Sequence, residues 1–548
     1  MAASTPKQVP ISLVAGEKNA NSQSIQEKIT RRQSQELVIA LSGPAGSGVR
    51  TTVKHFQELL KTVGYNAVVI KLSSHIKEKF KSAKVTKESS IPPKLKDVDV
   101  DNLGAFDRYE KLQDIGNYLR EAYEPNILAQ VAISEILLHR AQIAKADYER
   151  LKKEQKIPEG MDEAKFTVEM FVPPKTAYLI DQLKNPAEVE LLRDVYGDLF
   201  YLIGNLCGEE ERKQNLITEG LKEKDAASVM IRDKRENEEH GQQLERTLQL
   251  SDYFISNVHG NHKELDHQIQ RLIDIVHRTH VFTPTKDEHG MYVAHSAALR
   301  SACLSRQVGA SIADQNGQVI ATGCNDVPKY DGGLYTVEDN SKEDLRCYNK
   351  GGKCYNDDYK KRLIRDKLSE ILERHHVQQA KELAEEMFRS TRLKHLIEFS
   401  RSIHAEMDAL ISIARKGGVS TKGCTLYTTT YPCHSCAGHI VAAGIHRVVY
   451  IEPYEKSLAI ELHGEAISTE KPSAKAVLFT HFVGVSPRRY QDFFLANEER
   501  KDKSGAVIVR NGYTLKPKIH QFLDSYRSME TKVLEHLKDT GLATAEGK

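Results

Sequence analysis

His404-Ala405-Glu406 and, further along, Pro432-Cys433-His434-Ser435-Cys436 are the two stretches that decide how this chain folds. Both are typical of the start of a helix, and a C-x-x-C pair there places its two sulfurs on one side of the helix. One imidazole and two thiolates fill three positions of a tetrahedral zinc ion and leave the fourth for water. The pattern therefore predicts that His404, Cys433 and Cys436 bind Zn²⁺.

Glu406 is placed to carry protons at this centre. It follows His404 by two residues, a spacing that keeps its carboxylate beside the metal and not bound to it. A carboxylate in that position takes a proton from an attacking water and passes it to the reacting molecule. The alternative is a structural zinc site closed by Cys424 or His434 as the fourth ligand, and the spacing of Glu406 argues against it.

The combined pattern H-x-E…P-C-x-x-C is the signature of zinc-dependent nucleobase deaminases. Residues 287–500 also resemble the deoxycytidylate deaminase branch of the cytidine deaminase superfamily. The stretches that carry this resemblance are Arg306-Gln307-Val308-Gly309-Ala310 and Thr322-Gly323-Cys324-Asn325-Asp326-Val327-Pro328. The resemblance implies a cytidine-deaminase-like α/β/α domain that removes the amino group of a cytosine nucleotide by hydrolysis.

The same resemblance implies roles for three further residues. Asn325 would contact the sugar or base of the substrate. Arg306 would either bind the substrate phosphate or form a structural ion pair beneath the site. Asp408 stands where relatives often carry asparagine. Because of this difference, the resemblance does not assign a ribose contact to Asp408.

Over most of its length the chain resembles the two-domain bacterial anti-phage dCTP/dCMP deaminases, which join a P-loop nucleotide-kinase-like region to the deaminase. Matching stretches are residues 180–186, 304–309 and 450–454. This resemblance implies that dCTP or dCMP is converted to dUTP or dUMP and ammonia, and that cytosine deoxynucleotides are depleted during phage attack. It also implies a homo-oligomer and an inhibitor or regulator that the sequence does not identify.

A glycine-rich loop follows the apolar run Leu37–Leu41 and indicates a phosphate site in an α/β domain. Val49 stands where a P-loop has lysine, but a shift of one residue makes Arg50 the cation. Loop N–H groups and a helix start can hold phosphate without lysine. We therefore favour binding of a nucleotide, with Mg²⁺, or a sensor or scaffold role, over kinase catalysis, and a purely structural loop stays an alternative. The residues assigned to it are Gly43, Gly46, Gly48, Arg50, Thr51 and Asp181, the last of which is equally explained as a helix cap.

The expected domain organisation has five segments. They are a flexible tail at 1–33, a P-loop nucleotide-kinase-like domain at 34–258, a linker helix at 259–286, the deaminase domain at 287–500, and a C-terminal helix and tail at 501–548. In the first domain we expect strands at 67–72, 177–180 and 251–257, and a loop over the lysine-rich residues 76–102. In the deaminase domain we expect strands at 309–313, 319–322, 424–429 and 447–451, and helices at 287–304, 403–415 and 434–443.

Composition narrows the functional classes. Lys+Arg number 78 against 76 Asp+Glu, which argues against a dedicated nucleic-acid surface. We find no secretion signal and no run of the ~20 apolar residues that cross a bilayer, so we expect a cytoplasmic protein with no membrane partner. Two alternatives stay open: a deaminase of bases in RNA or DNA, and a nucleotide-responsive P-loop switch protein with an inert deaminase half.

Cys347 and Cys354 flank a Gly-Gly turn and are candidates for a second, structural zinc site. Several deoxycytidylate deaminases carry such a zinc, and Cys303, His375 or His376 would complete it here. Two free thiols on a polar loop explain the pair equally well.

Overall fold

The computed structural model describes residues 24–86, 90–235, 243–257, 261–340, 342–391, 396–453, 457–469, 475–496, 499–508 and 522–525. Most of the tail expected at 1–33 and most of the C-terminal helix and tail expected at 501–548 lie outside these residues. The described end of the expected tail forms a short helix, α1 (Ile25–Thr30), which a capping box of Ser24 and Glu27 begins.

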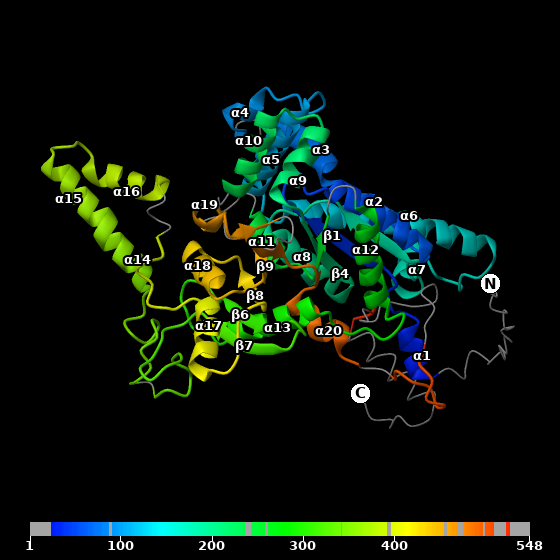
Figure 1. Ribbon diagram of the computed structural model, residues 1–548. Coiled ribbons are helices and arrows are strands. Elements are labelled where there is room, and N and C mark those ends of the chain that lie inside the picture. Colours follow the sequence, from blue (N-terminus) through cyan, green and yellow to red (C-terminus); the bar gives the residue numbers. More distant parts are fainter. Residues whose placement is uncertain are drawn as a thin grey trace, which may run out of the picture. The chain divides into compact units, whose positions relative to one another are not determined.

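The chain divides into two compact units. The smaller one is drawn from residues 1–35, 143–174 and 520–548, and the larger one from 36–142 and 175–519. In the smaller unit, helix α7 (Glu163–Glu169) contributes Phe166 to a cluster with Tyr148 and Phe171. The larger unit holds both β-sheets that the structure describes (Figure 1). It also contains His404, Cys433 and Cys436.

The first sheet has six strands in the order β12-β5-β4-β1-β3-β2. All neighbours are parallel except β12 and β5. The central strands are buried along their whole length, as strands covered on both faces are. Their bounds are β1 (Leu37–Ser42), β2 (Asn66–Ile70), β3 (Thr176–Ile180), β4 (Phe200–Leu206), β5 (Tyr253–Ser256) and β12 (Gly484–Val485).

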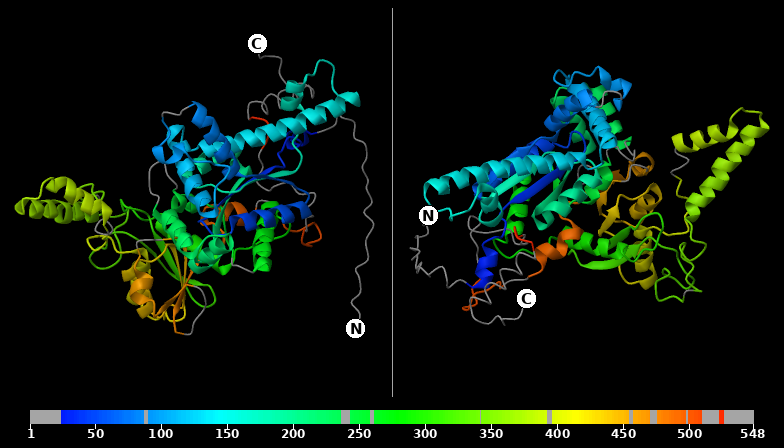
Figure 2. Two further views of the ribbon diagram at one scale, coloured as in Figure 1. Left: turned by 90° about the horizontal axis from the view of Figure 1, so that it is seen from above. Right: turned by 180° about the vertical axis from the view of Figure 1, so that it is seen from behind.

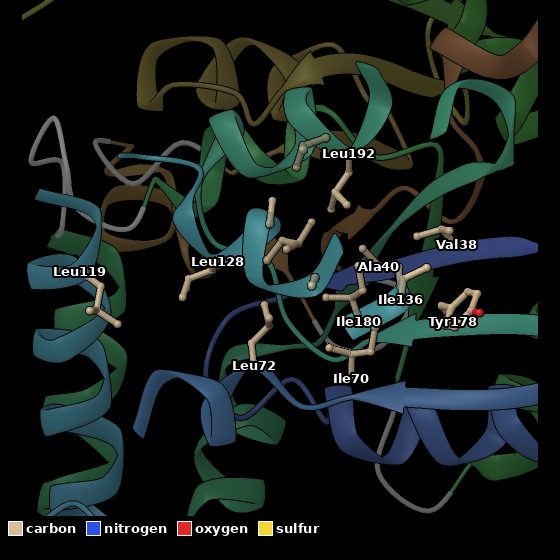
Figure 3. Close-up of a cluster of buried hydrophobic side chains, with 14 of the residues drawn as sticks. Val38, Ala40, Ile70, Leu72, Leu119, Leu128, Ile136, Tyr178, Ile180 and Leu192 are labelled. Carbon is tan, nitrogen blue, oxygen red and sulfur yellow. The ribbon is translucent and has the colours of Figure 1, made fainter. Parts of the chain in front are cut away.

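Helices cover both faces of this sheet. On one face lie α3 (Leu72–Thr86), α5 (Ala105–Ala122), α6 (Ile127–Lys153) and α8 (Pro186–Tyr196); on the other lie α2 (Val49–Thr62) and α12 (His262–His277). Figure 3 shows the first of these cores, in which Val38 and Ala40 of β1 share a cluster with Leu128 and Ile136 of α6. The other described helices of this region are α4 (Pro93–Lys96), α9 (Glu209–Thr218), α10 (Glu223–Arg235) and α11 (Leu244–Gln249).

The loop expected over 76–102 is wrong for its first part, where α3 continues to Thr86. Phe80 and Ala83 are fully buried in the core of the first sheet, and the helix turns several of the lysines that suggested a loop toward solvent. Helix α6 is the one described helix long and apolar enough, by length and composition alone, to cross a membrane. It packs Leu128, Ala132 and Ile136 in the same core.

The second sheet also has six strands, in the order β10-β11-β9-β8-β6-β7. They are β6 (Gly309–Ala313), β7 (Val319–Cys324), β8 (Thr425–Thr430), β9 (Arg447–Glu452), β10 (Ile467–Ser468) and β11 (Val477–His481). Four of its strands, β6 to β9, match those expected from sequence to within two residues, whereas β10 and β11 were not expected. Strand β6 is antiparallel to both its neighbours, and the remaining pairs are parallel.

Helices α17 (Ala405–Lys416) and α18 (His434–Ala442) cover one face of the second sheet, and α13 (Lys286–Ala298) covers the other. A glycine in β6 and a glycine in β7 let α13 and α17 pack closely against the sheet. A Cβ on Gly309 would lie 2.0 Å from the carbonyl oxygen of Ala294, and one on Gly323 would lie 2.2 Å from that of Ala405. The sheet and its two helix layers therefore fix where α17 begins.

The segment between β7 and α17 adds four short helical elements. They are α14 (Tyr355–Lys360), a π-helical turn at Lys361–Asp366, α15 (Lys367–Arg374) and α16 (Ala380–Ser390). Helices α15 and α16 lie side by side in Figures 1 and 2. The remaining described helices are α19 (Ala459–His463) and α20 (Tyr490–Phe494).

Candidate metal centre

Two helix starts meet at the edge of the second sheet. His404 is the N-cap residue of α17, and Cys433 is the N-cap residue of α18, directly after strand β8. Side chains at N-cap positions lie beside the free N–H groups and the positive end of the helix. Cys433 uses this position, because its Sγ accepts a hydrogen bond from the N–H of Cys436 at 3.4 Å.

The three side chains expected to bind zinc come together. Nδ1 of His404 lies 3.3 Å from Sγ of Cys433 and 3.4 Å from Sγ of Cys436. All three donor atoms lie within 4.8 Å of one another, and no other group of three or more such donors occurs among the described residues. A hydrogen bond from the Cys436 thiol, with His404 beside it, lowers the pKa of Cys433.

This donor set fits zinc. One imidazole and two thiols on the starts of two helices match the ligand types and the facing geometry of a three-ligand catalytic site. The helix ends favour the thiolate form that binds metal. Cys424, considered as a fourth ligand, is buried against Ser420, to whose carbonyl its thiol donates.

Glu406 lies at the same place, in the first turn of α17. Its side chain is 4% exposed, and this burial raises the pKa of its carboxyl group above the usual range. A buried carboxyl group beside the metal ligands is positioned to exchange protons with a reactant and not with bulk water.

A cavity of about 520 Å³ opens onto these residues. His404, Glu406 and Cys433 form its floor, and the segment between β7 and α17 supplies much of its wall. Cationic side chains that line it are Arg306, Lys360 and Arg401, and the aromatic ones are Tyr355 and Tyr431. A cavity with buried proton-carrying groups and cationic walls suits a small anionic substrate.

Asn325 and Arg306 both line this cavity. The Asn325 side chain accepts from the N–H of Val308 at 2.7 Å and donates to the carbonyl of Arg306 at 2.8 Å. It therefore holds the backbone of this wall in place. Arg306 keeps a half-exposed side chain at the cavity and pairs with Glu452 at 3.6 Å.

Glu452 and Tyr431 are site residues that sequence reasoning missed. Glu452 ends β9, accepts a hydrogen bond from Thr430 at 3.0 Å, and has its pKa raised by burial. Tyr431 lines the cavity and packs edge-on against Tyr450. Both residues lie at the carboxyl ends of β8 and β9, which are parallel neighbours. A correct prediction of that strand pairing would have placed them at the site.

Asp408 does not line the cavity; it points from α17 toward the second sheet. Its Oδ2 accepts a hydrogen bond from the N–H of Cys324 at 3.1 Å, and burial raises the pKa of its carboxyl group. Cys347 and Cys354 line the cavity together with Cys303. The three thiols do not form a group as tight as the first one, so the second zinc site stays a sequence-based expectation.

The residues assigned to nucleotide binding lie at the first sheet, away from the metal ligands. The loop of Gly43, Gly46 and Gly48 joins β1 to α2, with Arg50 and Thr51 in the first turn of α2. Asp181 follows β3, and its Oδ1 accepts from the N–H of Leu72, the first residue of α3, at 2.9 Å. Asp181 thus accepts an N–H group at the start of a helix.

Comparison with known proteins places the second sheet and its helices in a family. The cytidine and deoxycytidylate deaminase zinc-binding region matches residues 284–452. Deoxycytidylate deaminase of Enterobacteria phage T4 is 30% identical over 169 residues, which are 30% of this chain and 78% of the phage protein. Deoxycytidylate deaminase of Enterobacteria phage T2 is 29% identical over 169 residues, which are 30% of this chain and 80% of the phage protein.

Other similarities are shorter or more distant. ComE operon protein 2 of Bacillus subtilis is 46% identical over 56 residues, 10% of this chain and 29% of that protein. The crystal structure of dCMP deaminase from cyanophage S-TIM5 shares 20% sequence identity and covers 37% of this chain and 100% of its own, with a TM-score of 0.21. Because the match to the phage T4 enzyme covers most of that protein, we conclude that the chain belongs to the cytidine and deoxycytidylate deaminase family of hydrolytic enzymes.

Proposed function

We propose that this enzyme hydrolyses the amino group from the cytosine ring of dCMP or dCTP, giving dUMP or dUTP and ammonia. The observation that carries the proposal is the buried carboxyl group of Glu406 beside the ligand set His404, Cys433 and Cys436, in one cavity. The names of the phage T4 and T2 relatives support deoxycytidylate as the substrate.

The chemistry divides between the metal and Glu406. Zinc held by the three ligands supplies Lewis-acid chemistry that makes a water molecule acidic enough to attack at neutral pH. Glu406 takes a proton from that water as its oxygen bonds to C4 of the ring, and delivers the proton to N3. A second transfer through Glu406 protonates the amino group, the C4–N bond breaks, and ammonia leaves while C4 becomes a carbonyl.

The cavity wall supplies charge for the substrate phosphate. Arg306 and Arg401 lie on it as cations from two different segments. Arg306 also pairs with Glu452 at 3.6 Å, and Lys360 pairs with Asp357 at 2.9 Å. Arginine at such a wall binds phosphate in two-pronged fashion, which a neutral nucleoside cannot exploit. We therefore expect nucleotides to react faster than cytidine.

Replacement of Glu406 by glutamine tests the proposal. We expect Glu406→Gln to keep its zinc, measured by elemental analysis, and to lose at least ~100-fold in ammonia release, because the proton carrier is gone. The matched control is Glu465→Gln, an exposed position with the same change of charge. Unchanged turnover in Glu406→Gln would remove the role assigned to this residue.

A substrate panel separates the remaining alternatives. Purified protein is incubated with dCMP, dCTP, CTP, cytidine and single-stranded DNA, and ammonia and uracil products are measured. Product from the deoxynucleotides alone supports the proposal, and product mainly from DNA supports the base-editing alternative. The same samples, run by sedimentation, test the homo-oligomer.

We propose further that the enzyme acts in the cytoplasm and drains cytosine deoxynucleotides in anti-phage defence. This proposal rests on the sequence resemblance to two-domain anti-phage deaminases. Cells that carry the active chain should lose dCTP after infection, and cells with Glu406→Gln should not. Equal dCTP in the two strains would exclude the defence role.

A further inference from the structure

A second cavity, of about 150 Å³, lies at the first sheet. It opens where the chain leaves β1 into the glycine loop and leaves β3 at Asp181. Strands β2 and β3 lie on one side of β1 and strand β4 on the other, so the chain crosses over β1 between β3 and β4. Ligands of open α/β sheets bind beside the carboxyl ends of strands at such a crossover.

One end of this cavity is built for an anion. The loop before α2 is held by side chains that donate to its carbonyl groups: Arg212 to Ala45 at 3.0 Å, Asn215 to Gly46 at 2.8 Å and Asn257 to Gly48 at 3.0 Å. These contacts fix the conformation of the loop, and Ala45 of the loop lines the cavity. Helix α2 has 14 residues and no acidic side chain in its first turn. Asp181 lines the same cavity, where the charge of Arg50 acts on its carboxyl group and its Oδ1 accepts the N–H of Leu72.

Arg50 adds a cation at the same end. It is exposed in the first turn of α2 and lines the cavity. Among the residues that the structure describes, it forms no ion pair. A cation, loop N–H groups and a helix N-terminus at one point are the elements that hold a phosphate group.

The other end of the cavity holds a buried guanidinium group. Arg120 lines the cavity and is 4% exposed. Its Nε and Nη2 contact Glu188 Oε1 at 2.9 and 2.8 Å, while its Nη1 is buried without a hydrogen-bond partner. A buried N–H group without an acceptor is costly, so Nη1 marks a place for an acceptor from a ligand.

Gly116 keeps space open beside this group. A Cβ on Gly116 would lie 3.5 Å from Nη1 of Arg120, and the residue lines the cavity. The walls between the two ends include Leu72 and Leu128, which also belong to the core in Figure 3, and the ring of Tyr109. Polar residues such as Ser73, Gln113 and Gln182 line the cavity as well, and apolar contacts beside the buried Nη1 donor suit a flat heterocycle that carries a ring acceptor.

We propose that this cavity binds a nucleoside phosphate. Its phosphate contacts the loop N–H groups and Arg50, and its base enters between Leu72 and Leu128 and accepts a hydrogen bond from Nη1 of Arg120. The site is distinct from the deaminase cavity and shares no lining residue with it. It gives a specific ligand and contact set to the nucleotide binding expected from the glycine loop.

Calorimetric titration of the full chain tests the proposal. The probes are dTMP, dTTP, AMP, ATP and inorganic phosphate, with and without Mg²⁺; none of them is a cytosine nucleotide, so none is turned over by the deaminase site. We expect at least one nucleoside phosphate to saturate one site per chain, at least ~10-fold more tightly than inorganic phosphate. Deamination of dCMP, measured separately, reports on the proposed function independently.

Three variants locate the site. Arg50→Gln should weaken the nucleoside phosphate at least ~10-fold, and Lys61→Gln, the same change at the exposed far end of α2, should leave its binding unchanged. Gly116→Ala fits the helix at ordinary contact distances and should weaken the nucleoside phosphate ~3-fold or more without affecting inorganic phosphate. Absence of saturable binding, binding that survives Arg50→Gln, or equal affinity for inorganic phosphate would overturn the proposal.

Discussion

Asp408 ties the catalytic helix to the neighbouring strand. Its carboxylate accepts the N–H of Cys324 in the interior, between α17 and β7. Asp408→Ala would leave that N–H group buried without an acceptor, which costs about 1–3 kcal/mol of stability. Asp408→Asn keeps an acceptor and should cost less. Denaturation of the two variants, with zinc content as a second measurement, checks the order; equal stability would show that the contact is dispensable.

His277 is a second residue with a testable energetic role. Burial lowers its pKa from 6.5 to about 4, with Lys175 adding to the effect. Its Nδ1 bonds to the carbonyl of Ile273, and its Nε2 lies 2.8 Å from the hydroxyl group of Tyr65. The neutral ring satisfies both contacts by donating through Nδ1–H and accepting at Nε2.

The unfolded chain binds a proton at His277 below pH 6.5, and the folded chain does so only below about pH 4. Stability therefore rises with pH across this window, by about 3 kcal/mol at most for a shift of this size. His277→Gln should flatten the dependence between pH 4 and 6.5. The test is the difference in unfolding free energy between wild type and variant at several pH values, and a constant difference would contradict the expectation.

The sequence predicts the proximity of the metal ligands better than it predicts the roles of the residues in the cavity wall. Spacing predicts that His404, Cys433 and Cys436 lie together, because His404 and Cys433 each precede a helix and Cys436 lies in the first turn of the second one. Asn325 was assigned to the substrate, and its amide turns out to be engaged with backbone groups, which no spacing reveals. Glu452 carries no local signal, since only the pairing of β8 with β9 brings it to the site.

Strand β12 joins the first sheet from a distant part of the chain. It comprises only Gly484 and Val485, and it adds an edge strand from a segment expected to belong to the deaminase domain. Two residues give no period-two pattern, so this strand could not be predicted. Glu288 of α13 secures it, because its Oε1 accepts the N–H of Val485 at 2.8 Å while Arg271 of α12 binds both carboxylate oxygens.

Glu288 is fully buried and Arg271 is partly buried, so removal of Glu288 leaves a largely desolvated guanidinium group without its carboxylate. We expect Glu288→Ala to lose about 3–5 kcal/mol of unfolding free energy. The double variant Arg271→Met/Glu288→Leu replaces the pair with apolar groups and should lose less, although the N–H of Val485 still lacks its acceptor. Denaturation of both variants tests this, and a double variant that is less stable than Glu288→Ala would refute it.

At the scale of the whole molecule, the two sheets share a core. Leu206, Leu248 and Phe254 from the first sheet and its helices lie in one cluster with Met291, Ala294, Tyr427, Val449 and Phe482 from the second. Arg489 reinforces the junction by bonding to the buried Asp252 at 3.1 Å. The boundary expected at residue 258 therefore runs through a continuous interior, which composition and local pattern do not show.

This shared core predicts how a fragment of residues 34–258 behaves. It lacks β12 and exposes Phe254 and Leu248, and each large apolar side chain that returns to water costs about 1.5–3 kcal/mol. We expect the fragment to aggregate or to bind a hydrophobic dye, and residues 34–508 to stay monodisperse or form a defined oligomer. Size-exclusion chromatography and thermal unfolding distinguish the two. If the shorter fragment unfolds cooperatively at the temperature of the full chain, the first sheet is self-sufficient and the shared core adds no stability to it.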